Sequence, residues 1–390
     1  MYPAPLPSPK IVFHLKEMYS VNNKSLRVMI GGGGTGGHIF PALAIAAEIR
    51  NRMPGSEILF VGAEGRMEMT RVPEAGFEIV GLPIAGLQRR LDPANLKLPF
   101  RLFASVQKAI GLVRSFRPDV CVGVGGYASA PLLLAARVLG IPYLIQEQNS
   151  FAGLTNKLLG RKARLICVAF PEMQRYFPGA RLRETGNPVR SDLLDMHTSP
   201  FEALRHFGLE PGRQTVLVLG GSLGARTINE AVYEALPAWA EKGFQVIWQT
   251  GNAFAGKAAA RIAETGKPGL ITLPFISEMH MAYAAADVVV SRAGALSLAE
   301  ICITGKASIL VPSPNVAEDH QTKNARSLVD RGAALWIPDS DARLKLGMEV
   351  ARLLPDTNRI EQLGMAAHGL ARPMATQTLV NHLIEIATPA

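Results

Sequence analysis

His38 ends a glycine-rich run, GGGGTGGH, at residues 31–38. Glycines let a ligand approach the backbone closely, and the helix predicted to follow offers N–H groups that favour anions. An imidazole just inside that helix has a suitable pKa to take a proton from a hydroxyl group. The run therefore predicts a ligand site with His38 as a candidate general base. A structural role for His38 in the turn is the alternative.

A second glycine loop, GGSLGAR, starts at Gly220 and resembles the first, with Gly220-Gly221-Ser222 matching Gly33-Gly34-Thr35. The first loop also fits the dinucleotide fingerprint GxGxxG, with Glu64 where a ribose-binding acid belongs, but a lone match of this kind is weak. A P-loop is excluded because no Lys-Ser or Lys-Thr pair follows the glycines. Each loop follows the first predicted strand of its half, so the sequence predicts two similar units that face one ligand.

Polar residues also follow several predicted strands. The clusters are GVGGYAS with Tyr127, IQEQNS with Glu147 and Asn149, GNPVR with Arg190, SRAGALSLAE with Glu300, and EDHQTKNA with His320, Gln321 and Asn324. Taken singly, each is explained equally well by a helix cap or a loop. Together, at the carboxyl ends of strands, they predict a shared cleft. Glu147 is the second candidate for the base.

These residues must be positioned by strands that alternate with helices along nearly the whole chain. Continuous apolar runs predict strands near 26–30, 57–62, 77–80, 119–124, 142–146, 164–169, 215–219, 244–249, 270–273, 287–290, 307–312 and 334–337. Apolar runs without alternation are typical of parallel sheets that helices cover on both faces. The pattern predicts an α/β protein of two Rossmann-like, doubly wound parallel-sheet domains facing a central cleft, joined near 185–192.

The composition limits the classes of partner. Residues 1–190 hold 24 Lys and Arg against 12 Asp and Glu, whereas residues 191–390 hold 17 against 20. An excess of this size predicts that the first half meets something anionic, but no nucleic-acid motif accompanies it, so we expect no nucleic acid. No run of residues is apolar enough to span a membrane or to serve as a signal peptide. The three cysteines form no CxxC pair, which predicts buried thiols in a reducing compartment.

The ordered motifs GGTGGHIFPALAIA, GVGGYASAPLLLAA, QEQN, GNPVR, GGSLGAR, PFI, SRAGALSLAE and EDHQTKNA cover the chain from about Leu26 to its end. In this order they resemble the MurG family, the lipid II-forming N-acetylglucosaminyltransferases of bacterial peptidoglycan synthesis. The resemblance implies a GT-B fold, no cofactor and no tightly bound catalytic metal. It implies transfer of GlcNAc from UDP-GlcNAc to the 4-hydroxyl of MurNAc in lipid I, undecaprenyl-pyrophosphoryl-MurNAc-pentapeptide, with inversion to a β-1,4 bond.

The resemblance also implies roles for individual residues. The donor is expected to contact Thr35, Gly36, Gly37, Asn149, Arg190, Ser222, Ile276, Ala295, Leu296, Ser297, Leu298, Ala299, Glu300 and Gln321. The pyrophosphate or sugar of the acceptor is expected at Gly33, Gly34, Gly125, Gly126 and Tyr127. Among these groups the Ile276 backbone would read uracil, and Glu300 would accept the ribose hydroxyls. Leu223 and His320 stand where relatives often carry Gln, which removes or changes a contact at each position.

The basic first half is expected to dock peripherally on the cytoplasmic face of the plasma (inner) membrane, an anionic surface that anchors the acceptor. The candidate patch combines apolar residues with nearby cations; an ordinary core helix and loop is the alternative. Its apolar members are Leu82, Ile84, Leu87, Leu91, Phe100, Phe103, Val106, Ile110 and Val113, and its cations are Arg89, Arg90, Arg101 and Lys108. Cell-wall synthesis proteins are further candidate partners.

The expected domains are an N-terminal extension at 1–25, an acceptor and membrane domain at 26–187, a donor domain at 188–370 and a C-terminal helix at 371–390 that packs back on the first domain. The competing enzymes are other GT-B members, a diacylglycerol glycosyltransferase or a UDP-GlcNAc 2-epimerase. A non-catalytic nucleotide-binding module is an alternative of another class.

Overall fold

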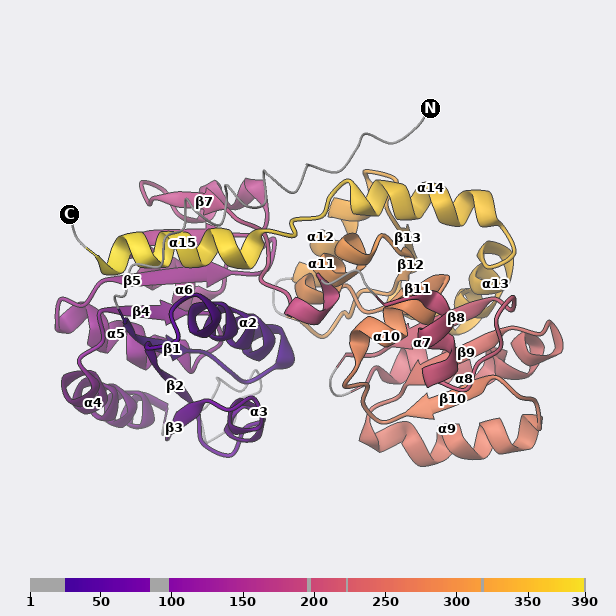
Figure 1. Cartoon of the computed structure of the whole chain (residues 1–390), viewed down its shortest axis with the longest axis horizontal. Helices are drawn as coiled ribbons and strands as arrows, with labels where there is room; N and C mark the ends of the chain where they lie inside the picture. Colours follow the sequence, from indigo (N-terminus) through magenta and orange to yellow (C-terminus); the bar gives the residue numbers. More distant parts are fainter. Residues whose placement is uncertain (1–24, 85–97, 195–197, 222–223, 317–318, 389–390) are drawn as a thin grey trace.

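Two α/β units lie side by side in the computed structural model, which describes residues 25–84, 98–194, 198–221, 224–316 and 319–388 (Figure 1). One unit is built on a seven-stranded sheet and the other on a six-stranded sheet. Every strand pair in both sheets is parallel. The predicted pair of doubly wound parallel sheets is therefore confirmed.

The first sheet has the strand order β3-β2-β1-β4-β5-β6-β7. Its strands are β1 (Arg27–Gly31), β2 (Glu57–Ala63), β3 (Glu78–Leu82), β4 (Val120–Gly123), β5 (Tyr143–Glu147), β6 (Leu165–Val168) and β7 (Leu182–Glu184). Its helices are α2 (Gly36–Arg52), α3 (Glu68–Glu74), α4 (Leu98–Phe116), α5 (Ser129–Val138) and α6 (Leu154–Gly160). The order reverses between β1 and β4, so the loops after these strands diverge and leave a crevice at the carboxyl edge of the sheet.

The second sheet has the order β10-β9-β8-β11-β12-β13, which repeats the first arrangement. Its strands are β8 (Thr215–Leu219), β9 (Gln245–Gln249), β10 (Leu270–Leu273), β11 (Val288–Ser291), β12 (Ala307–Leu310) and β13 (Leu335–Trp336). Its helices are α7 (Pro200–His206), α8 (Arg226–Glu241), α9 (Asn252–Thr265), α10 (Met279–Ala285), α11 (Ala295–Thr304), α12 (His320–Val329), α13 (Ala342–Leu353) and α14 (Thr357–His368).

Every strand range predicted from the sequence overlaps an observed strand, because the strands are buried on both faces. Val28, Met29 and Ile30 of β1 are all fully buried, although successive side chains of a strand point to opposite faces. Helix α8 covers its sheet through Ile228, Val232 and other apolar residues that recur every three or four positions. Each such fully buried side chain contributes about 1.5–3 kcal/mol.

The last helix, α15 (Ala375–Ala387), returns to the first unit, where Figure 1 shows it in yellow beside α2. Leu379, Val380 and Leu383 are fully buried in the core that α2 shares. Arg52 also donates a hydrogen bond to Asn381 Oδ1 at 2.7 Å. The segment after α14 therefore links the second unit to the first a second time, in addition to the join near residue 190.

The apolar residues of α4 that were predicted to form one membrane patch differ in their exposure. Ala109 and Val113 are buried in the core, whereas Phe100 and Phe103 are 77% and 66% exposed. The inclusion of Leu82 and Ile84 in the patch is wrong, because both side chains are buried in the same core as Val113. Leu87, Leu91, Arg89 and Arg90 lie outside the described residues.

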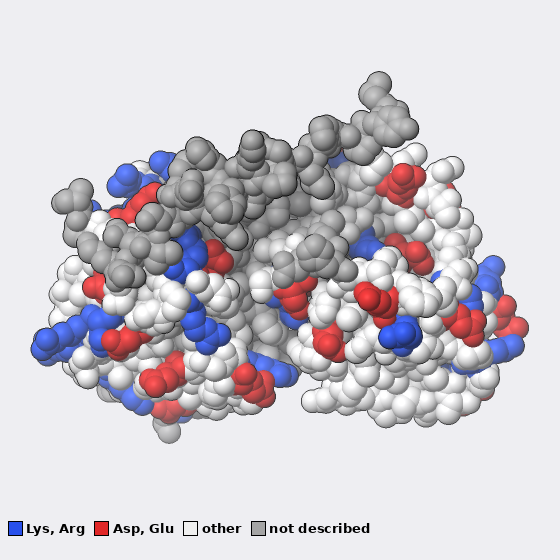
Figure 2. Space-filling view, viewed as in Figure 1, with Lys and Arg blue, Asp and Glu red and all other residues white. Residues whose placement is uncertain are grey.

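Charged side chains of both signs are interspersed on the face of the molecule in Figure 2. Lys108 of α4 forms an ion pair with Glu64 at 3.2 Å. The three cysteines are buried free thiols, and burial raises the pKa of Cys167 to about 12. Within the described ranges, no helix has the length and apolarity to cross a membrane.

Candidate active site in the cleft between the units

A cavity of about 1320 Å³ lies between the two units and is lined by both. The loops after β1, β4 and β5 line one side, and those after β8 and β11 line the other. The following residues predicted from the sequence line the cavity: Thr35, Gly36, Gly37, His38, Gly125, Gly126, Tyr127, Glu147, Asn149, Arg190, Ile276, Ala295, Leu296, Ser297, Glu300, His320 and Gln321. The cleft thus gathers residues that are up to 286 positions apart in the chain.

A few predicted residues lie elsewhere. Gly33, Gly34 and Ala299 are not part of the cavity lining, and Leu298 is 2% exposed in the core of the second unit. Ser222, like Leu223, lies outside the described residues. The described part of the chain contains no group of three His, Cys, Asp or Glu side chains that could hold a metal ion.

His38 stands in the first turn of α2, and its ring is held from one side. Its Nδ1 lies 3.2 Å from Thr35 Oγ1, and the ring also donates a hydrogen bond to the Gly33 carbonyl. A Cβ on Gly126 would lie 2.4 Å from the Gly33 carbonyl oxygen and 3.4 Å from His38 Nδ1, so this carbonyl lies on the Nδ1 side of the ring. Since a carbonyl only accepts, we assign the proton of the neutral ring to Nδ1, which leaves Nε2 with a lone pair. Burial lowers the pKa of His38 to about 4; the Gly33 hydrogen bond opposes this shift, and the nearby His320 adds to it. The ring is therefore neutral at pH 7 and able to accept a proton.

Glycine is required where the loop after β4 meets His38. Gly125 has a φ of +92°, and a Cβ there would lie 2.7 Å from His38 Cδ2 and 3.0 Å from His38 Nε2. Gly126 has a φ of +74°, and its Cβ would lie 2.4 Å from the Gly33 carbonyl oxygen. The bare backbone is thus needed to pack two loops around one imidazole, in addition to any approach of a ligand.

Glu68 supports the first glycine loop from below, a role that the sequence does not reveal. The carboxylate is 1% exposed and accepts hydrogen bonds from the backbone N–H groups of Gly34 and Ala63, each at 3.0 Å. A Cβ on Gly33 would lie 2.1 Å from Glu68 Oε1. The Gly34 N–H is therefore already paired, and it points to a carboxylate rather than toward the cavity.

Glu147 directs its carboxylate to its own loop. It accepts hydrogen bonds from the backbone N–H groups of Asn149 (3.2 Å) and Gly153 (3.1 Å), and from Asn156 Nδ2 (2.8 Å). Burial raises the pKa of Glu147, and these hydrogen bonds oppose the shift. Both oxygens are occupied in shaping the loop from 147 to 156, so the geometry favours His38 over Glu147 as the base.

Arg190 and Glu300 meet on the other side of the cleft. Glu300 is 6% exposed, accepts a hydrogen bond from Tyr283 Oη at 3.1 Å and lies 3.7 Å from Arg190 Nε. Burial raises the pKa of Glu300, while the charge of Arg190 and the Tyr283 hydrogen bond lower it. Arg190 also donates to the Ser277 carbonyl at 3.2 Å, and its guanidinium lies 5.1 Å from the centre of the Phe40 ring of the first unit.

Gln249 at the end of β9 connects the second glycine loop to Ile276, a predicted donor contact. Its Nε2 donates to the Gly221 carbonyl at 2.9 Å, and its Oε1 accepts from the Ile276 N–H at 3.3 Å. Next to it, Ala295, Leu296 and the following residues form the first turn of α11, whose N–H groups have no partner within the helix. Gln249 and Tyr283 were not predicted from the sequence, since neither residue belongs to a polar cluster.

Two asparagines join the units across the cleft. The Ser150 N–H and hydroxyl both donate to Asn324 Oδ1, at 3.1 and 2.8 Å. Asn324 Nδ2 lies 3.4 Å from Asn149 Oδ1. On the same side, Gln321 Oε1 accepts from the Ser313 N–H at 2.8 Å, which leaves the amide nitrogen of Gln321 to donate to a ligand.

Comparison with known proteins gives the same two units. Residues 28–168 match the glycosyltransferase family 28 N-terminal domain, and residues 215–378 match the C-terminal domain of that family. The chain is 52% identical over 368 residues, 94% of this chain and 97% of the relative, to a protein of Porphyromonas gingivalis. It is 48% identical over 377 residues to a protein of Bacteroides fragilis, with 95% and 99% of the two chains covered. Both are named UDP-N-acetylglucosamine--N-acetylmuramyl-(pentapeptide) pyrophosphoryl-undecaprenol N-acetylglucosamine transferase.

Solved structures agree. The chain resembles MurG of Acinetobacter baumannii at 30% identity and a TM-score of 0.72, over 92% of this chain and 99% of that chain. A UDP-N-acetylglucosamine 2-epimerase aligns with a TM-score of 0.65 over 93% and 96% of the two chains. That enzyme is 13% identical, so the likeness shows a common fold and nothing of its activity.

Proposed function

The chain belongs to glycosyltransferase family 28, and from this premise we propose that it transfers GlcNAc from UDP-GlcNAc to the 4-hydroxyl of MurNAc in lipid I, which gives lipid II and UDP. Relatives about half identical over nearly the whole of both chains carry the name of that activity. The observation in the structure that best supports it is the neutral imidazole of His38, held through Nδ1 beside a cavity that both units line.

His38 Nε2 acts in this proposal as the general base. A hydroxyl that attacks the anomeric carbon gains positive charge on its oxygen, and removal of the proton relieves it. Because the attack comes from the side opposite UDP, a single step inverts the anomeric configuration. The base must therefore stand on the acceptor side of the cleft, and His38 belongs to the unit that we assign to the acceptor, whereas Arg190 and Glu300 belong to the unit that we assign to the donor.

The donor is assigned to the second unit, residues 188–370. Arg190, Ser222 and the first turn of α11 balance the diphosphate charge, which grows as UDP leaves. Glu300 accepts the ribose hydroxyls and the Ile276 backbone reads uracil. Asn149 and Gln321 donate from their amide nitrogens to the GlcNAc hydroxyls, since the oxygen of each already accepts a hydrogen bond.

The acceptor and the membrane are assigned to the first unit, residues 26–187. We place the enzyme peripherally on the cytoplasmic face of the membrane through the start of α4. Phe100, Leu102 and Phe103 are exposed there on either side of Arg101. Apolar side chains that enter the headgroup region, together with cations attracted to anionic lipid, are the two contributions that peripheral attachment uses.

The release of UDP tests the proposed reaction. The purified chain is mixed with UDP-GlcNAc, with and without a short-chain analogue of lipid I. We expect UDP to appear only when the acceptor analogue is present, together with an acceptor that carries GlcNAc. An epimerase would convert UDP-GlcNAc without the acceptor, and a nucleotide-binding module would release UDP in neither mixture.

A further inference from the structure

Gln148, the first residue after β5, has a buried side-chain oxygen with no hydrogen-bond partner. The residue is 2% exposed and lines the cavity, between Glu147 and Asn149 in the chain. Its Oε1 contacts no donor among the residues that the structure describes. A buried amide oxygen without a donor costs about 1–3 kcal/mol, so this oxygen calls for a group that the protein itself does not supply.

The direction of this oxygen is fixed by the groups on the other end of the amide. Gln148 Nε2 donates to the Val124 carbonyl at 2.6 Å, and a carbonyl can only accept. The same nitrogen donates to Gln146 Oε1, and Gln146 Nε2 donates to Asn187 Oδ1 at 3.0 Å. Because exchanging the oxygen and nitrogen of Gln148 would set two oxygens against each other, Oε1 must face away from Val124.

The chain of amides reaches the second unit through Asn187. Asn187 Nδ2 donates to two carbonyls, that of Gln148 at 3.1 Å and that of Ala295 at 3.3 Å. Ala295 is the first residue of α11, the helix whose N-terminus is proposed to face the diphosphate. The orientation of Gln148 is therefore tied through Asn187 and Gln146 to the donor side of the cleft.

The oxygen of Gln148 and the base face the same small space. A Cβ placed on Gly125 would lie 3.0 Å from His38 Nε2 and 3.4 Å from Gln148 Oε1. Gly125 thus lies beside one nitrogen lone pair and one amide oxygen. Both accept hydrogen bonds, so a ligand that reaches this edge of the cavity with two hydroxyl donors close together would satisfy both.

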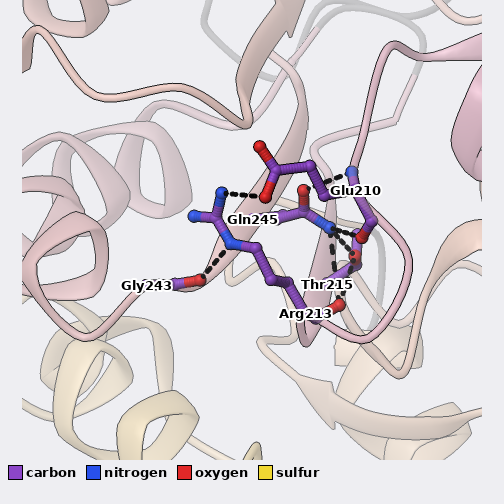
Figure 3. A network of polar contacts seen from close by, with 5 residues as sticks. All are labelled: Glu210, Arg213, Thr215, Gly243 and Gln245. Carbon is purple, nitrogen blue, oxygen red and sulfur yellow. Dashed lines mark hydrogen bonds and ion pairs between the residues drawn. The ribbon is translucent and has the colours of Figure 1, made fainter.

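Gln245, at the opposite end of a strand in the second unit, shows how a purely structural glutamine is satisfied (Figure 3). Its Oε1 accepts from the Glu210 N–H at 2.8 Å, and its Nε2 donates to the Glu210 carbonyl at 3.0 Å and to Thr215 Oγ1 at 3.2 Å. Both ends of this amide have protein partners. Gln148 is equally buried but has a partner at one end only.

We propose that Gln148 Oε1 accepts a hydrogen bond from the 6-hydroxyl of the acceptor sugar and so holds the neighbouring 4-hydroxyl against His38 Nε2. This inference rests on the proposed function. In MurNAc the oxygen at position 3 is an ether of the lactyl group and has no proton to donate. The 6-hydroxyl is therefore the hydroxyl donor on the other side of the reacting 4-hydroxyl, and two acceptors side by side match two such donors.

The test is a double-mutant cycle between the enzyme and its substrate. The full chain and Q148L are assayed with a short-chain lipid I analogue and with the same analogue made with 6-deoxy-MurNAc. We expect wild type to lose on the order of 10-fold in kcat/KM for the acceptor when the 6-hydroxyl is absent, the value of one neutral hydrogen bond. Q148L should lose about as much with the complete acceptor and nothing further with the deoxy acceptor.

Two controls separate binding from folding. UDP binding to Q148L should equal that of wild type, which shows that the donor side is intact. Q245L, a matched change of a buried glutamine away from the cavity, should lower the melting temperature and leave the ratio between the two acceptors as in wild type. If Q148L does not bind UDP, Q148N replaces it, since this variant keeps the amide and withdraws the oxygen by one methylene group.

Several results would overturn the inference. The first is equal kcat/KM of the wild-type enzyme for the two acceptors. The second is a further loss in kcat/KM when Q148L is given the deoxy acceptor in place of the complete one. The third is a Q245L variant that no longer prefers the complete acceptor. A failure of the proposed function looks different, because the wild-type enzyme would then transfer no GlcNAc to the complete acceptor.

Discussion

Replacing Glu300 with glutamine is expected to weaken donor binding while the protein stays folded. The carboxylate is 6% exposed, and in the proposed function it accepts the ribose hydroxyls. A hydrogen bond to a charged acceptor is worth about 1.5–3 kcal/mol and one to a neutral acceptor about 0.5–1.5 kcal/mol. The change from carboxylate to amide therefore removes about 1–1.5 kcal/mol, or about 10-fold in the KM for UDP-GlcNAc.

The neighbours of Glu300 decide which substitution is informative. Tyr283 Oη donates to the carboxylate at 3.1 Å, and Arg190 Nε lies 3.7 Å from it. Alanine would leave the buried Tyr283 hydroxyl without an acceptor, at a cost of about 1–3 kcal/mol, and would remove the negative charge beside Arg190. Glutamine keeps an oxygen for Tyr283, so E300Q should unfold within a few degrees of wild type.

The assay compares donor KM, UDP affinity and melting temperature for wild type, E300Q and Y283F. Y283F keeps the carboxylate and should change the donor KM less than E300Q does. Because burial raises the pKa of Glu300, the wild-type donor KM should rise as the pH falls through that raised value, and E300Q should lack this dependence. A donor KM for E300Q equal to that of wild type would refute the role of Glu300.

Three further predictions follow from the same structure. H38A should lower kcat by about 10²–10⁴ with UDP binding unchanged; because the pKa of His38 is lowered to about 4, protonation of its ring should reduce wild-type kcat near pH 4 rather than near pH 6.5. A near-normal kcat for H38N would place the base elsewhere. The double variant F100E/F103E should bind vesicles that contain anionic lipid at least about 10-fold more weakly, since each buried Phe is worth about 1.5–3 kcal/mol, and it should keep its activity on a soluble acceptor. L344E is the control, because Leu344 is 77% exposed in the second unit. Equal vesicle binding by both variants would contradict membrane attachment through the start of α4. E68Q has one oxygen for the two N–H groups of Gly34 and Ala63, so it should lose about 1–3 kcal/mol of stability. It should lower kcat/KM for the acceptor more than it raises the donor KM, since Glu68 pairs with Gly34 in the part of the loop expected to meet the acceptor; a raised donor KM with unchanged kcat/KM for the acceptor would show that the loop serves the donor instead.

The sheets were predictable because their strands are buried on both faces. Residues such as Val288, Val289 and Val290 are all fully buried, and so the strand reads as one apolar run. Strand β7 was not predicted: its three residues, Leu182–Glu184, are partly or fully exposed at the edge of the sheet, and their sequence has no apolar run. The expected apolar patch mixed exposed and buried residues. Phe100, Phe103 and Val113 of α4 recur with one helical spacing, and this spacing does not reveal that the first two are exposed and the third is buried.

The lining of the cavity was predictable where it lies in loops that directly follow strands. The parallel topology brings these loops to the carboxyl edge of each sheet, which is why His38, Arg190 and Glu300 line one cavity although each belongs to a different motif. The residues that were missed act from below the loops. Glu68 is the first residue of α3, which follows another strand, and its hydrogen bond to the Gly34 N–H depends on packing that no local sequence pattern records.

The sequence could not tell which of several adjacent polar side chains faces the cavity. Of the three consecutive residues Glu147, Gln148 and Asn149, the sequence favoured the carboxylate as a candidate base. In the structure the carboxylate turns to its own loop, while the neighbouring amide, at a residue that lines the cavity, has a buried oxygen without a partner among the described residues. Which of several consecutive side chains faces a ligand depends on the bend of the chain after the strand, and only the fold determines that bend.

The glycosidic bond formed in the product is the most direct test of the proposed transfer to the 4-hydroxyl. The wild-type enzyme is given UDP-GlcNAc and a short-chain lipid I analogue, and the product is analysed by NMR for the position and anomeric configuration of the new sugar. A single attack by the 4-hydroxyl, with His38 on one side and UDP leaving on the other, predicts GlcNAc linked β-1,4 to MurNAc. An α linkage, attachment at another hydroxyl, or conversion of UDP-GlcNAc without transfer to the acceptor would contradict the account.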